Sequence, residues 1–204
     1  MLIEVLKLRF LIFFYYFLSH FSYNHLIHNT QIHNNYGGGN LKTVIFYSSD
    51  YRTNTEKIAE IMASEMGADY VNVGNFKNDN YSVEQYDLIG FGSGVYREDL
   101  SNDLYKLTER LMLKEKKVFV FSTSGIGMSF YNKRLLRHLT SKGAMSLGSF
   151  ACKGSFTVSD FSEVKIFKLL GKSAEGHPDE KDLSNAKAFI LKIMDSMKKE
   201  NNTI

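Results

Sequence analysis

The sequence is short of cysteine and proline, and it has no tryptophan. Its one cysteine, Cys152, excludes an internal disulfide framework and a metal site built from several cysteines. So little cysteine is typical of a reducing compartment, and we expect a cytoplasmic protein. The single proline leaves the loops to glycine, serine and asparagine. A formal net charge of only +3 gives no electrostatic case for a nucleic-acid partner, which would require a basic stripe.

The length and composition fit one globular domain with some surplus chain. Of the 204 residues, 44% are hydrophobic and 23% are charged, ordinary values for a protein with a full core. The surplus lies at the start, because residues 1–40 differ from everything after them. An apolar and aromatic run at Leu8–Phe21 precedes a segment rich in asparagine and histidine, which ends in Gly37-Gly38-Gly39.

Three interpretations of residues 1–40 compete. The apolar run could be a signal peptide or anchor, but it is shorter than the ~20 residues of a membrane span and lacks a clean cleavage site. It could also be an extension that packs on the domain. We favour a third interpretation, an upstream translation artefact, because a triple glycine can be encoded by a ribosome-binding purine tract and Leu41 by the alternative start codon TTG. The gene sequence tests this idea.

Our domain assignment is an extension over residues 1–40, disordered or artefactual, and a single domain over residues 41–204. We expect no membrane association for that domain. The histidines of the extension lack tight metal-ligand spacing, so we expect no metal site there.

From Leu41 onwards, segments with strand patterns alternate with segments with helix patterns. The expected elements are a buried strand at Val44–Tyr47, a helix at Asn54–Met66, strands at Tyr70–Val73 and Leu88–Phe91, a helix over Leu100–Leu111, a strand at Val118–Phe121, a helix around Leu135–Leu139, a strand at Leu147–Cys152 and a last helix around Ala186–Met197. Such alternation predicts an α/β fold in which a parallel sheet has helices on both faces. Within it Cys152 is expected to behave as a small buried hydrophobic residue.

Three of the predicted strands are followed by segments rich in glycine and hydroxyl groups. These segments are Ser48–Thr55, Gly92–Tyr96 and Ser122–Gly127. In open parallel sheets, ligands bind outside the carboxyl ends of the strands, where strand order reverses. None of the three segments is acidic enough for a metal ion. Together they predict a site for a phosphate and a flat, polar ring system.

The first of these segments has the features of a phosphate loop. A buried strand runs through hydroxyl and amide side chains into a helix, so that free backbone N–H groups and the positive end of the helix dipole point at one place. The segment matches neither the Walker loop nor the G-x-G-x-x-G fingerprint. Taken alone, it also fits a simple helix cap in which Thr53 or Asn54 is the capping residue.

At this point the chain resembles the flavodoxins over about residues 42–197. The resemblance is carried by Tyr47-Ser48-Ser49 with Thr53-Asn54-Thr55-Glu56, by Tyr86-Asp87-Leu88-Ile89-Gly90-Phe91-Gly92-Ser93-Gly94-Val95-Tyr96, by Phe121-Ser122-Thr123-Ser124-Gly125, and by Phe150-Ala151-Cys152-Lys153-Gly154 with Gly176-His177-Pro178-Asp179. It implies a single doubly wound, five-stranded parallel sheet of order 2-1-3-4-5 with FMN at the switch point.

The resemblance also implies which residues hold the FMN. The phosphate would be bound by the backbone and hydroxyl groups of the first loop, and the flavin ring by the two later loops, with Gly94 beside the ring edge and Tyr96 stacked on it. Tyr131 is a weaker candidate for the second stacking face. The candidate cofactor-binding residues are Ser48, Ser49, Arg52, Thr53, Asn54, Thr55, Ser93, Gly94, Val95, Tyr96, Ser122, Thr123, Ser124 and Gly125.

Two departures from the family pattern fall in the phosphate loop. Thr53 stands where flavodoxins usually carry glycine, and the loop is one residue longer. Arg52 is an unusual cation for a site that normally works through neutral donors. It either contacts the phosphate or points to solvent, and the sequence leaves both alternatives open.

The function implied by the resemblance is low-potential electron transfer between redox partner proteins, with FMN as the redox group. An NAD(P)H-dependent FMN or quinone reductase on the same fold is the alternative, and a flavodoxin-like binding module that has lost FMN is a second alternative. No catalytic side chain and no metal are expected. From Leu41 onwards the chain contains 23 Lys and Arg and 21 Asp and Glu. This near balance weakens any expectation of an acidic docking rim. We expect a monomer or a weak dimer.

Overall fold

A computed structural model describes residues 41–49, 53–75, 81–156 and 171–201 of the chain. Its centre is a parallel sheet with the strand order β2-β1-β3-β5-β6. These strands are β1 (Thr43–Ser48), β2 (Asp69–Asn72), β3 (Leu88–Tyr96), β5 (Lys117–Ser124) and β6 (Met145–Lys153). A two-residue strand, β4 (Asp99–Leu100), pairs antiparallel with the end of β3. Counted along the parallel strands, the order is the predicted 2-1-3-4-5, so the predicted fold class is confirmed.

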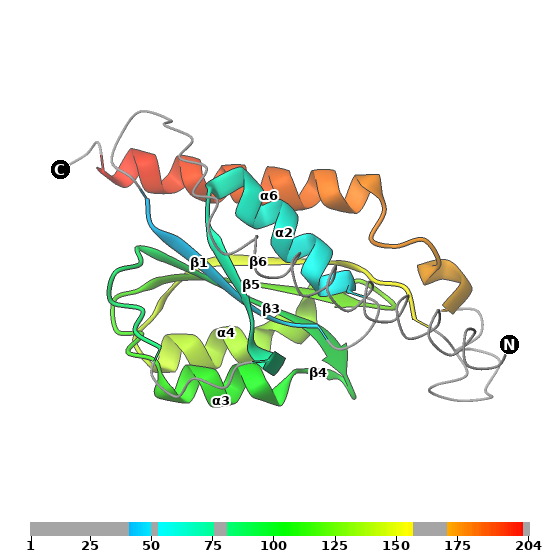
Figure 1. Cartoon of the computed structure of the whole chain (residues 1–204), viewed down its shortest axis with the longest axis horizontal. Helices are drawn as coiled ribbons and strands as arrows, with labels where there is room; N and C mark the ends of the chain where they lie inside the picture. Colours follow the sequence, from blue (N-terminus) through cyan, green and yellow to red (C-terminus); the bar gives the residue numbers. More distant parts are fainter. Residues whose placement is uncertain (1–40, 50–52, 76–80, 157–170, 202–204) are drawn as a thin grey trace, which may run out of the picture. The chain divides into compact units, whose positions relative to one another are not determined.

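Helices cover both faces of the sheet (Figure 1). One face carries α2 (Asn54–Met66) and α6 (Glu180–Asn201), and the other carries α3 (Asn102–Arg110) and α4 (Asn132–Ser141). Short 3₁₀ turns, η2 (Val73–Asn75) and η3 (Ser129–Tyr131), follow β2 and precede α4. The alternation of side chains along each strand divides the core between the two faces.

On β1 this division is plain. Val44 and Phe46 pack towards α3 and α4, whereas Ile45 and Tyr47 pack towards α2 and α6. All four side chains are buried, which is why β1 appears in the sequence as a continuous apolar run.

Two glycines on β3 make room for large rings on the neighbouring strand. A Cβ atom at Gly90 would lie 2.4 Å from Cζ of Phe119, and one at Gly92 would lie 2.0 Å from Cζ of Phe121. Both phenylalanines are fully buried beneath the α2 and α6 layer. The absence of side chains at these two positions therefore lets β5 bury two aromatic rings directly over β3.

Strands β3 and β5 are longer than the apolar runs from which they were predicted. The residues expected to form loops at Gly92–Tyr96 and Ser122–Ser124 are the last residues of β3 and β5. They stay extended because they pair with each other, and β3 then turns back through Arg97 and Glu98, both at positive φ, to form the hairpin with β4. The loop assignment was wrong, although the position of these residues at the carboxyl edge was right.

Over the part of the chain that the structure describes, no helix combines the length and the apolar character that crossing a bilayer requires. The predictions for residues 1–40, and the alternatives for Arg52, lie outside the described residues. Cys152 is 4% exposed at the end of β6, as predicted for a small buried residue, and burial raises the pKa of its thiol.

Candidate functional site

The three predicted segments meet at one edge of the sheet. Ser48 pairs in register with Ser93, and Ser93 pairs with Ser122, so that the carboxyl ends of β1, β3 and β5 form one row. Across this row, the hydroxyl oxygens of Thr55 on α2 and Thr123 on β5 lie 2.8 Å apart and share a hydrogen bond. The first and third segments are thus tied together directly.

Three hydroxyl groups at this edge are buried without a hydrogen-bond partner. They are Oγ of Ser48, Ser49 and Ser122. A buried hydroxyl that lacks a partner costs on the order of 1–3 kcal/mol relative to its hydrated state. In the described residues only two other side-chain atoms share this condition, Oγ1 of Thr43 at the opposite end of β1 and Oδ1 of Asn132 at the start of α4. The unpartnered hydroxyls are therefore concentrated where the sequence predicted a ligand.

The residue that precedes α2 has a left-handed backbone conformation. Thr53 occupies the N-cap position with φ 53° and ψ 19°, and its side chain makes no capping hydrogen bond. The simple capping interpretation of Thr53 is therefore wrong, because the residue provides the position but no cap. A positive φ is the conformation that glycine adopts without strain, so the threonine at this position carries a backbone cost that glycine would not.

The side chain of Asn54 is used within the protein. Its Nδ2 donates to the carbonyl of Ser155 at 2.8 Å, and Oγ of Ser155 donates back to Oδ1 of Asn54 at 3.3 Å. The chain after β6 is held from two more sides, because the N–H of Gly154 donates to the carbonyl of Ser124 and the N–H of Ser155 to that of His177. The Asn54 side chain is therefore bonded to this neighbouring loop, and the predicted contact of Asn54 with a cofactor stays a prediction.

At the end of β3, Ser93 also makes internal bonds. Its hydroxyl donates to the carbonyl of Gly94 at 2.6 Å and accepts the N–H of Ser101 at 2.8 Å, which joins the hairpin to the start of α3. Val95 pairs with Leu100 within the hairpin and packs towards the α3 and α4 side of the core. These side chains hold the backbone in place.

Two aromatic rings lie against glycines at the same edge. A Cβ atom at Gly94 would be 2.9 Å from Oη of Tyr96, and one at Gly125 would be 2.3 Å from Cε1 of Phe156. Tyr96 was predicted as a stacking residue, whereas Phe156 was missed. A signal was available, since Phe156 follows Gly154 by two residues and the predicted strand Leu147–Cys152 by four. Tyr131 lies in η3 and packs against the α3 and α4 side of the core, and its role as a second stacking face stays a prediction.

The remaining candidate, Ser124, accepts the N–H of Gly127 through its Oγ at 2.9 Å and so shapes the turn after β5. The structure thus brings the described candidates together at one edge and divides them into two groups. The hydroxyls of Ser48, Ser49 and Ser122 have no partner. The side chains of Asn54, Thr55, Ser93, Thr123 and Ser124 are engaged with other parts of the protein.

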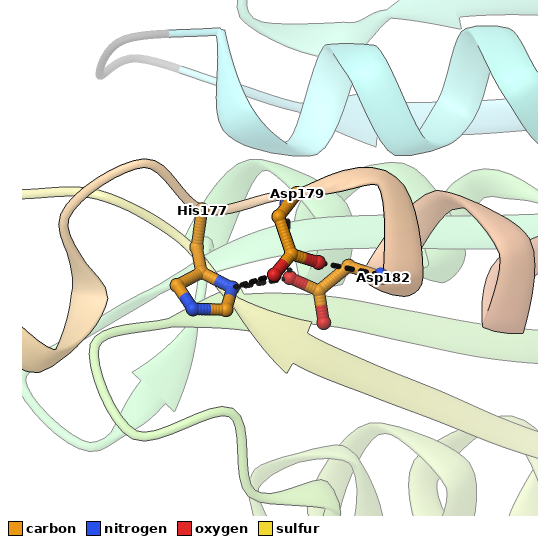
Figure 2. Close-up of side chains that lie close together, drawn as sticks. All are labelled: His177, Asp179 and Asp182. Atoms are coloured by element: carbon orange, nitrogen blue, oxygen red, sulfur yellow. Dashed lines mark hydrogen bonds and ion pairs between the residues drawn. The ribbon is translucent and has the colours of Figure 1, made fainter.

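A separate polar cluster stands at the start of α6 (Figure 2). His177, Asp179 and Asp182 offer ligand atoms within 4.8 Å of one another, a spacing that a metal ion could bridge. Their hydrogen bonds account for them without a metal. The N–H of Asp182 donates to Asp179 and the N–H of Asp179 to Asp182, a reciprocal helix cap, while Nδ1 of His177 bonds to the Asp182 carboxylate. Donation from the Asp182 N–H lowers the pKa of Asp179.

Comparisons with known proteins agree with this architecture. A family model described as a flavodoxin domain matches residues 44–202. An uncharacterized protein of Methanocaldococcus jannaschii is 40% identical over 156 residues, which cover 76% of this chain and 99% of that protein. Among solved structures, a flavodoxin from the domain Archaea is similar with a TM-score of 0.53 and 16% identity, covering 77% of this chain and 99% of that one.

Flavodoxin 2 from Bacillus cereus is similar with a TM-score of 0.50 and 20% identity, and the match covers 76% of this chain and 99% of that one. At these identities the two solved structures support the fold alone. The family model spans most of the chain, and its limits enclose every strand tip described above. The chain belongs to the flavodoxin-domain family.

Proposed function

We propose that this protein binds FMN at the carboxyl edge of its sheet and carries electrons between partner proteins. One observation carries the proposal: the buried hydroxyls of Ser48, Ser49 and Ser122 have no hydrogen-bond partner at adjacent strand ends of a flavodoxin-domain chain. Donors that lack a partner inside the protein are suited to a polar ligand that enters from outside.

The phosphate of FMN would be held at the first strand end. Ser48 and Ser49 supply neutral hydroxyl donors there, and the helix α2 that begins at Asn54 adds the positive end of its dipole. The left-handed conformation of Thr53 turns the chain into that helix. Asn54, bonded to Ser155, fixes the helix start against the chain that leaves β6.

The flavin ring would lie towards the ends of β3 and β5. Gly94 and Gly125 offer backbone there, Ser122 offers a hydroxyl donor, and Tyr96 and Phe156 offer aromatic faces. Bound FMN supplies the electron-accepting chemistry, while the side chains around it orient the ring and exclude water. No acid, base or metal from the protein is needed for that role.

A titration with FMN and with riboflavin, which lacks the phosphate, tests the proposal. Quenching of flavin fluorescence by the full-length protein should show binding of one FMN and much weaker binding of riboflavin. The double variant Ser48→Ala/Ser49→Ala should bind FMN about 100-fold more weakly, because two donors to a charged group are lost, each contributing about 1.5 kcal/mol. Riboflavin affinity should change less.

Thr43→Val is the matched control, because Thr43 also carries a buried hydroxyl without a partner, at the amino end of β1. It should leave FMN affinity unchanged. A protein that stays colourless in excess FMN, or a control that weakens binding as much as the serine variant, would refute the proposed site.

Reductive titration separates the carrier from a reductase. We expect photoreduction of the FMN-loaded protein to proceed in two resolved one-electron steps, and NADPH to have no effect on the flavin spectrum. Rapid bleaching by NADPH in a single two-electron step would assign the protein to the reductases instead.

A further inference from the structure

Exposed apolar side chains stand immediately beyond the third strand end. Met128 is 50% exposed and Phe130 is 45% exposed, in the short connection between β5 and α4. The bond from the Gly127 N–H to Ser124 ties this connection to the end of β5. These two side chains are therefore the nearest exposed apolar groups in sequence to the proposed ring-binding segment.

Charge is segregated over the same part of the chain. Residues 116–159 contain seven Lys and Arg and no Asp or Glu. In α4, Asn132, Leu135 and Leu139 are buried against the sheet, which leaves Lys133, Arg134 and Arg137 on the outer face. The cations follow Phe130 at three, four and seven residues, the spacing of one helix face.

The cations of this face differ in their pairing. Arg134 forms a salt bridge with Asp99 and lies over the ring of Tyr105. Lys133 and Arg137 form no salt bridge with any other residue that the structure describes. Their charges are thus available to a partner.

We propose that Met128, Phe130, Lys133 and Arg137, here called the α4 patch, form the docking surface for an acidic redox protein. The inference rests on the proposed function, because docking matters only if a redox group lies at the adjacent strand ends. An apolar centre with a rim of charge is the usual composition of a protein interface, and the sign of the rim selects a partner of opposite charge. Two exposed apolar side chains make a small contact, and small interfaces are typical of transient complexes.

The surrounding charges favour an acidic partner over a second copy of this chain. Near the patch are Asp99, matched by Arg134, and Glu98, which together with burial raises the pKa of Tyr131. A third carboxylate, Glu109 on α3, forms a salt bridge with Lys142, and Arg134 is taken up by Asp99. Lys133 and Arg137 therefore outnumber the one remaining carboxylate, Glu98. A symmetric dimer through the patch would bring the unpaired cations of both copies together, which costs free energy.

The first test maps binding, which does not depend on FMN. An acidic [2Fe–2S] ferredoxin is added to the ¹⁵N-labelled full-length protein, and amide chemical shifts are followed. We expect shift changes centred on residues 127–138 that vanish in about 0.5 M NaCl, where screening confines charge interactions to a few ångströms. Changes centred elsewhere, or dimerisation through the patch without ferredoxin, would overturn the proposal.

The second test uses charge reversal. Lys133→Glu/Arg137→Glu should lower the second-order rate of electron transfer from reduced ferredoxin to the FMN-loaded protein about tenfold or more at low salt. In that transfer the iron–sulfur cluster loses one electron and the flavin gains it. Lys192→Glu/Lys198→Glu on α6 makes the same charge change on the opposite side of the sheet and should change the rate less than about twofold. Equal effects of the two variants would overturn the proposal.

The variant Phe130→Ser tests the apolar part of the α4 patch without changing any charge. It should slow electron transfer by a similar factor at every salt concentration at which the complex still forms, because it removes apolar contact area and no charge. FMN affinity, measured for every variant, separates the two hypotheses. Normal FMN binding with no preference for α4 would refute the docking surface alone, and absent FMN binding would refute the proposed function while the amide-shift map still decides the surface.

Discussion

The two helices that share one face of the sheet begin in opposite ways. At the start of α6, Asp179 and Asp182 cap each other's N–H groups and His177 completes the set, so that the polar groups are satisfied from within (Figure 2). At the start of α2, Thr53 provides no cap, and the hydroxyls of Ser48 and Ser49 that precede it lack partners.

The difference shows how to tell a structural polar cluster from a binding site. Both regions are rich in polar side chains and both lie at a helix N-terminus, where negative charge is favoured. The α6 start supplies that negative charge with its own carboxylates. The first turn of α2 also carries a carboxylate, Glu56, but that group accepts a hydrogen bond from the Tyr47 hydroxyl, and the buried hydroxyls of Ser48 and Ser49 stay without a partner. Under the proposed function an anion from outside would bind there.

Placing a carboxylate at the α2 start should produce the largest effect. In Ser49→Asp, the new charge would lie at the proposed phosphate site, and repulsion of the FMN phosphate should lower FMN affinity about 100-fold or more. Two unit charges about 4 Å apart interact with about 4 kcal/mol at an effective dielectric constant of about 20. Fluorescence titration measures the affinity.

The stability of the ligand-free Ser49→Asp variant supplies the second half of this test. A helix N-terminus favours a carboxylate by about 0.3–1 kcal/mol, which offsets part of the cost of placing a charge where the Ser49 hydroxyl is buried, so urea unfolding should show at most a modest loss of stability. Weak FMN binding together with strong destabilisation would indicate general damage and would remove the support for an anion site.

The α6 cap should give a pH dependence that the α2 start lacks. The N–H of Asp182 stabilises the Asp179 carboxylate and lowers the pKa of Asp179 in the folded protein. Its contribution to stability is therefore fully present above the unfolded pKa of aspartate and is lost as the pH falls through the lowered folded value. Urea unfolding of wild type and Asp179→Asn should differ most near pH 7 and converge in acid.

The matched control for this pH series is Thr53→Asn, because the N-cap position of α2 holds no carboxylate and makes no side-chain capping bond. Its stability difference from wild type should stay constant over the same pH range. A difference for Asp179→Asn that grows as the pH falls would contradict the assigned direction of the pKa shift.

The sequence was sufficient for the parts of the fold that depend on local pattern. The bounds of α2 agree with the helical periodicity of Asn54–Met66, and the three polar strand ends meet as their positions after buried strands predicted. The β3–β4 hairpin was missed because its turn is formed by Arg97 and Glu98 at positive φ, and neither residue type signals such a turn.

The contacts that organise the site escaped prediction for a different reason. Asn54 meets Ser155 across 101 residues of sequence, and Phe156 covers Gly125 only because β6 lies beside β5. No local pattern specifies which side chain is engaged by a distant neighbour. The distinction between partnered and unpartnered hydroxyls therefore became visible only in three dimensions.

The smallest expected effect concerns the left-handed residue at the α2 start. Thr53 adopts φ 53°, which costs a non-glycine residue about 1–2 kcal/mol, whereas Gly67, at the other end of the same helix, adopts φ 61° with the residue type suited to it. Thr53→Gly removes that strain, but the greater freedom of glycine in the unfolded chain raises the entropic cost of folding by about 0.4–1 kcal/mol. The net gain should be about 0.5–1 kcal/mol in urea unfolding, with FMN affinity unchanged or improved. Gly67→Ala, the control, should instead destabilise the protein by about 1 kcal/mol. If Thr53→Gly also lost stability, the threonine side chain would contribute more to stability than the backbone strain costs.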